Sequence, residues 1–288
     1  MSDEPVDRPL VAMPPLPSIT PLTSLDLEGD HPSFTREVAL PNGCLSIHTR
    51  DARVHLDALC EFAARINRKR GFLFVSRVLG RHLPVTPAVM RQSYDGLADL
   101  LPADLPGPIL FFGLAETAIA LGHGVYRAYV TRHDRRDAAY LHSTRYRFDR
   151  PLLCNFSEEH SHATEHFVYA PQDPALGARI AQARTLVLVD DEMTTGQTFA
   201  NILKPLRDAL PALEQVFGVV LTDWSVNRRR VGSFEARSLL RGEFTFTPRA
   251  DAETPHMPNV TSRDVARDAT LPRNDGRFGL SAPLVLSD

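Results

Sequence analysis

Residues 186–198 carry the side chains whose types and spacing point most directly to a chemical task. Four apolar residues at 186–189 predict a buried strand, and Asp190 and Asp191 follow at its carboxyl end. A short loop leads from the acids into an amphipathic helix that we expect to start near Thr198. In open parallel sheets, ligands bind where strands end and helices begin, so we expect a ligand at this loop.

The loop has the composition of a phosphate-binding cradle. Successive backbone N–H groups beside the positive end of a helix dipole attract anions. Thr194, Thr195 and Thr198 add hydroxyl donors, and Gly196 lets the backbone approach the anion closely. The two carboxylates before the loop would repel a bare phosphate. They suit the vicinal hydroxyls of a ribose, or a magnesium ion that bridges ribose and diphosphate.

The string from Leu186 to Thr198 resembles the signature with which type I phosphoribosyltransferases bind 5-phosphoribosyl 1-diphosphate (PRPP). It differs from a P-loop because no lysine follows Gly196. The resemblance implies that Asp190 and Asp191 hold the ribose hydroxyls and reach Mg²⁺ through ribose or water. The residues that it implies for the 5-phosphate are Met193, Thr194, Thr195, Gly196, Gln197 and Thr198.

Strand and helix patterns alternate through the second half of the chain. The expected strands are 108–112, 125–131, 185–190 and 215–222, and the expected helices are 114–122, 174–183 and 198–209. This alternation predicts an α/β fold with a parallel sheet and helices on both faces. The resemblance identifies the fold as that of type I phosphoribosyltransferases, with a hood subdomain that supplies contacts to the base.

The chain divides into three parts by composition. Residues 1–33 are rich in proline and predict an extended arm, and residues 249–288 predict a polar tail. Residues 34–248 form the expected phosphoribosyltransferase domain, with the hood at 34–104 and the core at 105–248. Within the hood we expect a hairpin at 34–49 around Asn42-Gly43, a helix at 51–69, a strand at 71–75 and a helix at 87–101.

A second anion site is expected directly after the strand at 108–112. In the family, a loop after the first core strand contacts the diphosphate of PRPP. Here that loop is Gly113, Leu114, Ala115, Glu116 and Thr117, whose backbone amides could receive diphosphate oxygens. The loop departs from the usual family pattern because it carries Glu116 and no basic residue. Glu116 either binds magnesium or a substrate amine, or stabilises the first turn of a helix.

The resemblance also implies a mobile loop that closes over the diphosphate, between the strands at 125–131 and 185–190. Arg145, beside two hydroxyl residues, is our candidate for bidentate diphosphate binding and catalysis. Further along, Glu159, His160, His162 and His166 form a candidate substrate lid. The histidines could instead hold zinc or lie scattered on the surface, and neither strand nor helix spacing aligns all three.

Arg77, with Ser76, Arg81 and His82, follows a buried strand, and we assign Arg77 to diphosphate. A basic surface patch is the alternative. Together with Gly-Leu-Ala-Glu-Thr-Ala at 113–118 and His-Ser-Thr-Arg at 142–145, this segment is similar to one branch of the family. That branch is the orotate-phosphoribosyltransferase-like proteins of bacterial tellurite-resistance (Ter) gene clusters. It implies synthesis of a nucleoside-like metabolite for a stress response.

Composition narrows the class of protein further. The chain of 288 residues has a net charge of −3, which argues against a nucleic-acid binder that works by bulk charge. No apolar run is long enough to span a bilayer. Three scattered cysteines without metal-ligand spacing suit reduced thiols in a cytoplasmic protein.

The leading hypothesis is a Mg²⁺-dependent phosphoribosyltransferase that joins PRPP to a nucleobase-like small molecule and yields a nucleoside monophosphate. One alternative is a non-catalytic regulator that senses PRPP or nucleotides on the same fold. Another is hydrolysis or phosphorolysis of a nucleotide at the same ribose-phosphate site. A homodimer is expected by resemblance alone.

Overall fold

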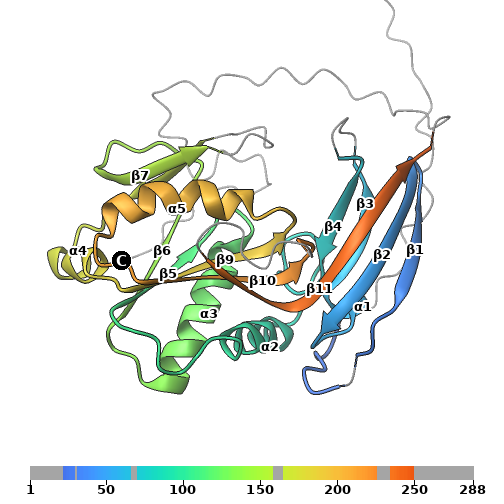
Figure 1. Cartoon of the computed structure of the whole chain (residues 1–288), viewed down its shortest axis with the longest axis horizontal. Coiled ribbons are helices and arrows are strands. Elements are labelled where there is room, and N and C mark those ends of the chain that lie inside the picture. Colours follow the sequence, from blue (N-terminus) through green and yellow to red (C-terminus); the bar gives the residue numbers. More distant parts are fainter. Residues whose placement is uncertain (1–21, 30, 66–69, 158–164, 226–233, 250–288) are drawn as a thin grey trace, which may run out of the picture. The chain divides into compact units, whose positions relative to one another are not determined.

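The computed structural model describes residues 22–29, 31–65, 70–157, 165–225 and 234–249. A seven-stranded sheet with the strand order β1-β2-β11-β10-β9-β5-β6 runs through this part of the chain (Figure 1). The five strands from β11 to β6 pair in parallel. They are β5 (Ile109–Gly113), β6 (Ala138–His142), β9 (Thr185–Met193), β10 (Gln215–Asp223) and β11 (Glu235–Pro248).

Helices cover both faces of the parallel strands, as predicted. In Figure 1, α5 (Gln197–Ala209) lies on one face, and α2 (Pro87–Ala98) and α3 (Ala118–His133) lie on the other. Because both faces are covered, strand β5 and the first five residues of β9 are buried throughout. The α/β fold class is therefore confirmed, with the expected strands at 108–112, 185–190 and 215–222 in place.

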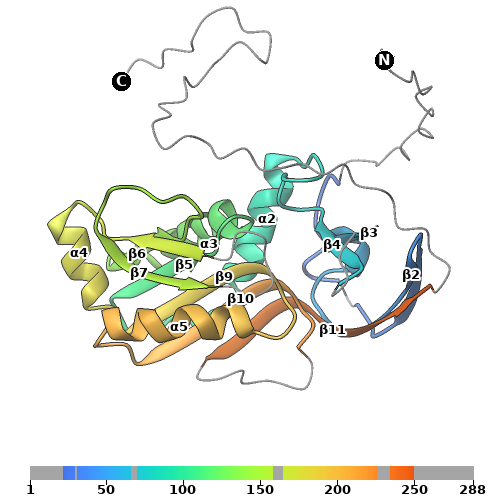
Figure 2. The same ribbon diagram turned by 90° about the horizontal axis from the view of Figure 1, so that it is seen from above.

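The hood contributes two antiparallel hairpins. Strands β1 (Thr35–Leu40) and β2 (Gly43–Ala52) form the predicted hairpin, and β3 (Cys60–Ala64) pairs with β4 (Phe72–Ser76). The first half of β11 pairs in parallel with β10, and its second half pairs antiparallel with β2 (Figure 2). The register shifts between Arg241 and Gly242, where β11 passes from the core to the hood.

Some hood and arm residues pack on the core. Helix α2 lies within the range that we assign to the hood, yet Tyr94 of α2 meets Gly124 of α3. Leu25, in the expected arm, is buried, and its amide donates to the side chain of Gln92 at 2.9 Å. The limits of arm, hood, core and tail remain predictions. Residues 250–288 of the expected tail lie outside the described residues.

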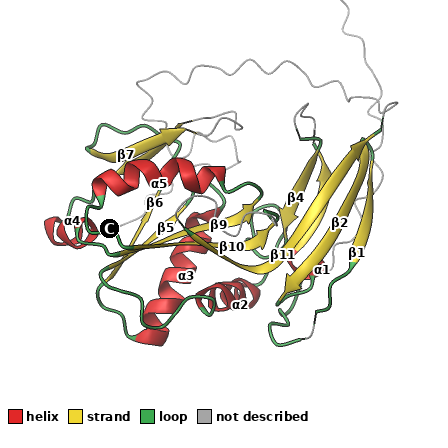
Figure 3. Cartoon of the chain, viewed as in Figure 1, coloured by secondary structure: helices red, strands yellow, loops and turns green. Residues whose placement is uncertain are grey.

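Two predicted elements are wrong (Figure 3). The expected helix at 51–69 is instead the short α1 (Leu56–Leu59) followed directly by β3. The expected strand at 125–131 is the second half of α3, which continues to His133. The structure places Val125 and Tyr129 among the buried residues of that helix, so their apolar character reflects one helical face.

The interval assigned to a mobile loop contains several regular elements. Besides β6, it holds the hairpin of β7 (Leu152–Ser157) and β8 (Glu165–Tyr169) and the helix α4 (Pro174–Ala181). Helix α4 confirms the expectation at 174–183. No helix in the described part of the chain is long and apolar enough to cross a membrane.

Candidate active site

The predicted phosphate cradle lies between β9 and α5. Strand β9 ends at Met193, which is buried, and α5 begins at Gln197. Gly196 at the helix N-cap has φ of 73°, in the left-handed region that favours glycine. The Gln197 amide donates to the Thr195 hydroxyl at 3.3 Å. Within the described residues, the amides of Gly196 and Thr198 have no acceptor, so they can receive an anion.

Asp190 and Asp191 precede the cradle and are partly buried. One carboxylate oxygen of Asp190 accepts a hydrogen bond from the Asp191 amide at 2.9 Å. Asp191 accepts a second one, at 3.0 Å, from the hydroxyl of Thr117. This bond ties the acids to the loop expected to bind diphosphate.

The structure places residues 113–117 beside the acids because β5 and β9 are neighbours, with Gly113 opposite Val189. The Leu114 amide donates to the Val189 carbonyl at 3.1 Å, and the Ala115 amide donates to the Ser143 hydroxyl at 2.9 Å. These two amides are therefore already occupied, which corrects the expectation that the whole loop offers donors. The peptide bond between Ala115 and Glu116 is cis.

Gly113 is the last residue of β5, so the remaining donors of the loop beyond this strand are the amides of Glu116 and Thr117. No acceptor is recorded for either of them in the described ranges. Thr117 is the N-cap of α3 and its side chain caps no helix amide, since its hydroxyl binds Asp191. The free donors thus sit at the start of a helix and next to the acids.

The basic partner of this loop comes from the hood. The guanidinium of Arg81 donates to the Glu116 carboxylate at 2.8 Å. Arg77, our sequence-based candidate, instead donates to the Asp57 carbonyl at 2.9 Å and to Glu61 at 3.0 Å. The sequence carried a signal for Arg81, because both arginines follow the same strand. It did not reveal which of them reaches the loop.

Arg145 lies in the segment that follows β6, and this segment also borders the diphosphate loop. Ser143 receives the Ala115 amide on its hydroxyl and donates its own amide to the Gly113 carbonyl at 3.1 Å. Arg145 follows two residues later and is partly buried. The segment that carries Arg145 therefore borders the loop at 113–117, and a role of Arg145 in diphosphate binding stays a prediction.

Of the candidate lid residues, only His166 is described. It is fully buried, its Nδ1 lies 3.0 Å from the Ser143 hydroxyl, and its ring stacks on Phe156 at 4.2 Å between centroids. His166 is therefore part of the packing around Ser143 and not of a lid over the substrate, which corrects the prediction for this residue. Glu159, His160 and His162 lie outside the described residues. Within the described part, no three His, Cys, Asp or Glu side chains are grouped as a metal site.

A third acid, Glu192, was missing from the sequence-based site. Its carboxylate accepts a hydrogen bond from Arg70 of the hood at 2.6 Å. The pKa of Glu192 is raised to about 7, chiefly because the carboxyl is buried; Arg70 opposes this rise and the charge of Asp191 adds to it. The sequence feature that could have pointed to Glu192 is the run of three acids at 190–192, because the family pattern accounts for only two of them.

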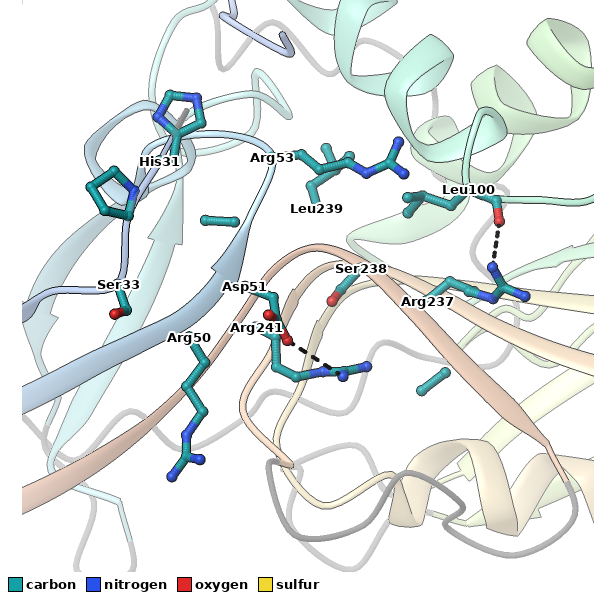
Figure 4. A pocket seen from close by; sticks show the side chains of 13 residues that line it. His31, Ser33, Arg50, Asp51, Arg53, Leu100, Arg237, Ser238, Leu239 and Arg241 are labelled. Carbon is teal, nitrogen blue, oxygen red and sulfur yellow. Dashed lines mark hydrogen bonds and ion pairs between the residues drawn. The ribbon is translucent and has the colours of Figure 1, made fainter. Parts of the chain in front are cut away.

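A separate hollow of about 600 Å³ lies between β2, β11 and the residue Leu100 (Figure 4). Its charged lining includes Arg50, Arg53, Arg237, Arg241 and Asp51. Arg50 pairs with Glu243 and Arg237 pairs with Glu235, both at 2.7 Å. None of residues 113–117 and 190–198 lines this hollow, so it is distinct from the candidate site.

Comparison with known structures finds phosphoribosyltransferases of low sequence identity. The adenine phosphoribosyltransferase from Rhodothermus marinus is 13% identical, with coverage of 65% of this chain and 96% of that one and a TM-score of 0.43. The Giardia lamblia enzyme complexed with 9-deazaadenine is 18% identical, with coverage of 64% and 94% and a TM-score of 0.42. The orotate phosphoribosyltransferase from Aeropyrum pernix is 17% identical, with coverage of 59% and 79% and a TM-score of 0.34.

No curated protein matches the sequence significantly. A family model described as phosphoribosyl transferase matches residues 59–245, which include the cradle, both acids and the diphosphate loop. The resemblance seen in the sequence is thereby confirmed at the level of the family. The chain belongs to the phosphoribosyl transferase family.

Proposed function

We propose that the chain transfers ribose 5-phosphate from PRPP to a ring nitrogen of a base in a Mg²⁺-dependent reaction, with release of diphosphate. One observation carries the proposal. The cradle at 193–198, the acids Asp190 and Asp191, and the loop at 113–117 lie side by side at the ends of two neighbouring strands. A PRPP molecule has its 5-phosphate and diphosphate on one ribose and needs such adjacent anion sites.

The cradle would bind the 5-phosphate with the amides of Gly196 and Thr198 and the hydroxyls of Thr194, Thr195 and Thr198, together with the start of α5. Met193 and Gln197 frame the loop. The 5-phosphate is remote from the reacting C1 carbon, so its binding energy orients that carbon.

At C1, the lone pair of the base nitrogen forms the new bond while the bond to the diphosphate oxygen breaks. The electron pair of the broken bond leaves with diphosphate, and the proton of the base nitrogen passes to solvent. Positive charge develops on the ribose in the transition state. The carboxylates of Asp190 and Asp191 would hold the ribose hydroxyls and stabilise that charge.

Diphosphate would bind to the free amides of Glu116 and Thr117 and to arginines. Arg81 already reaches this loop through Glu116, and Arg145 follows the segment that supports it. Arginine donates two parallel hydrogen bonds to phosphate oxygens, so Arg81 can exchange its carboxylate partner for diphosphate. Arg77, which directly follows β4 in the same hood segment, remains a proposed contributor to diphosphate binding.

The residues present suit Mg²⁺. This ion binds through one or two carboxylates plus substrate phosphates and keeps several waters, so it needs no dedicated protein cage. Asp190 and Asp191 supply such oxygens, and Glu116 supplies another once Arg81 releases it. When bound, Mg²⁺ would neutralise charge on the leaving diphosphate. The substrate lid at Glu159, His160 and His162 also stays a proposal.

We extend the proposal to the product and the assembly. The similarity to the Ter-cluster branch supports a nucleoside monophosphate product that serves a stress response. The family resemblance supports a homodimer. A regulator that binds PRPP without chemistry is the second candidate, because the cradle alone would serve both. Sedimentation velocity of the full chain would decide the assembly.

Diphosphate release from PRPP and Mg²⁺ with a panel of nucleobases separates enzyme from regulator. We expect base-dependent release, reduced by about 10²-fold or more in the double variant Asp190→Asn/Asp191→Asn, because charge stabilisation is lost. Asp208→Asn, at the far end of α5, is the control and should behave as wild type. PRPP binding without release for any base would favour the regulator. Near-normal turnover of the double variant would contradict the role of the acids.

A further inference from the structure

One ion pair joins the hood to the strand that carries the acids. The Arg70 guanidinium donates to Glu192 at 2.6 Å, and the two side chains are 31% and 16% exposed. Arg70 also lies over the ring of Phe72, with its carbon Cζ 4.9 Å from the centroid, and 5.7 Å from that of Phe74. Its charged end is therefore held in place against the core.

Two buried, stacked aromatic rings lie close to this pair. The Trp224 ring stacks on Phe74 at 4.6 Å between centroids with an interplanar angle of 15°. The Trp224 amide donates to the carbonyl of Met193, which follows Glu192 in the chain. The indole Nε1 of Trp224 is buried and has no hydrogen-bond partner in the described part of the chain. The Arg70–Glu192 ion pair and the stacked rings of Phe74 and Trp224 thus lie together between the hood and the cradle.

The position of this pair relative to PRPP follows from the proposed function, on which the inference rests. The 5-phosphate would occupy the loop at 193–198 and diphosphate the loop at 113–117. The base must then reach C1 from the remaining side, which the hood covers. Arg70 belongs to the hood and Glu192 directly follows the two acids, so this pair offers a donor and an acceptor where hood and acids meet.

We propose that Arg70 and Glu192 recognise the acceptor base and select a neutral heterocycle whose edge carries a hydrogen-bond donor beside an acceptor. A guanidinium only donates and a carboxylate that binds it accepts, so together they match such an edge. An acceptor with its own carboxylate meets Arg70 but is repelled by Glu192. The pair therefore provides selection through repulsion as well as attraction.

A purely structural tie between hood and core would act differently. Breaking it would weaken the binding of every ligand that needs a closed hood, whatever its base. Recognition by Arg70 and Glu192 instead changes the relative affinity for different bases. The useful quantity is thus the gain in affinity from ribose 5-phosphate to each nucleoside 5′-monophosphate, since it isolates the contribution of the base.

Calorimetric titrations of the full chain with Mg²⁺ measure this gain, using ribose 5-phosphate, AMP, IMP, UMP and orotidine 5′-monophosphate. We expect at least one neutral-base nucleotide to bind about tenfold or more tightly than ribose 5-phosphate, as one or two buried hydrogen bonds provide. Orotidine 5′-monophosphate, which carries a carboxylate, should show no gain. Glu192→Gln and Arg70→Gln should each reduce the gain for the neutral bases, because a neutral amide forms weaker hydrogen bonds than a charged group. Both variants should keep the affinity for ribose 5-phosphate.

The matched control is Glu214→Gln. Glu214 binds Arg184 at 2.7 and 2.9 Å near the opposite end of β9, so this variant also breaks one ion pair. It should retain every gain. Three outcomes would overturn the inference and leave the proposed function intact. They are equal gains in wild type and Glu192→Gln, a tightest complex with orotidine 5′-monophosphate, and no gain for any base. Failure of ribose 5-phosphate and PRPP to bind at all would overturn the proposed function, and the inference with it.

Discussion

Single residues at the candidate site hold its loops through short hydrogen bonds, and Ser143 is the clearest case. Its buried hydroxyl accepts the Ala115 amide and contacts His166 Nδ1. Ser143→Ala leaves a buried amide without an acceptor, so we expect a loss of about 1–3 kcal/mol in unfolding free energy. Urea denaturation measures the loss, and PRPP affinity should fall as well because the diphosphate loop loosens.

Ser93→Ala is the matched control for Ser143→Ala. Ser93 is also buried, but its hydroxyl donates to the Met90 carbonyl of its own helix. Removing it leaves no amide unpaired, so the loss of stability should be clearly smaller. Equal losses in the two variants would show that the Ser143 contacts do not hold the loop.

Gly196 supports the cradle through its backbone conformation. Its φ of 73° is unfavourable for a side chain, so Gly196→Ala should cost about 1–2 kcal/mol and weaken binding of PRPP. Gly177→Ala in α4 is the comparison, because an added Cβ would meet only Pro171 at an ordinary 3.7 Å. Thermal unfolding should show a lower Tm for the first variant only. An unchanged Tm in Gly196→Ala would contradict the strain that we infer.

The strand, loop and helix of the proposed cradle could be predicted from the sequence because they form a local structure. Asp190 to Thr198 are consecutive, and the strand, loop and helix that position them follow from nearby residues alone. Arg81 and Glu192 could not be placed in this way. Their partners, Glu116 and Arg70, are far away in the chain and are brought near only by the packing of hood and core.

At the scale of elements, the β3–β4 hairpin is held by aromatic rings. Phe74 contacts Phe72, Trp224 and Phe244 at 5.6, 4.6 and 5.4 Å between centroids. Phe74→Ala removes these contacts and should cost about 3–5 kcal/mol. Hydrogen exchange should accelerate in β3 and β4 more than in β5 and β9. Phe148→Ala, at a side chain that is 54% exposed, is the control and should change exchange little.

The two wrong predictions, a helix at 51–69 and a strand at 125–131, have physical causes. Gly122 and Gly124 lie at the junction of the expected helix at 114–122 and the expected strand at 125–131, and glycine has a low helix propensity. In the fold, these glycines permit close packing, since a Cβ on Gly122 would lie 2.8 Å from the Gly113 Cα. At 51–69, residues such as Leu59 and Phe62 match a helical spacing, but pairing of β3 with β4 overrides that local preference.

For the whole molecule, we expect a pH dependence of stability from Asp137. Arg135 donates two hydrogen bonds to Asp137 at 2.9 Å, and they hold the pKa of this carboxyl below its ordinary value of 3.8. The stabilisation is therefore present above about pH 4 and is lost as the pH falls through the lower, folded-state pKa. It is modest because the side chain of Asp137 is 40% exposed.

Urea denaturation of wild type and Asp137→Asn at several pH values tests this. The difference in unfolding free energy should be present at pH 7 and shrink towards zero below pH 4. Asp134→Asn, at a side chain that is 86% exposed, should show little difference at any pH. A difference for Asp137→Asn that persists unchanged at pH 2 would rule out the ion pair as its source.

Binding of PRPP at the ends of β5 and β9 is the central claim about the molecule as a whole. Calorimetric titration of PRPP into the full chain, with and without Mg²⁺ and repeated with Asp190→Asn/Asp191→Asn, tests it most directly. We predict Mg²⁺-dependent binding to the wild type that the double variant loses while it remains folded. Absence of binding to the folded wild type, or equal binding to the double variant, would contradict the account.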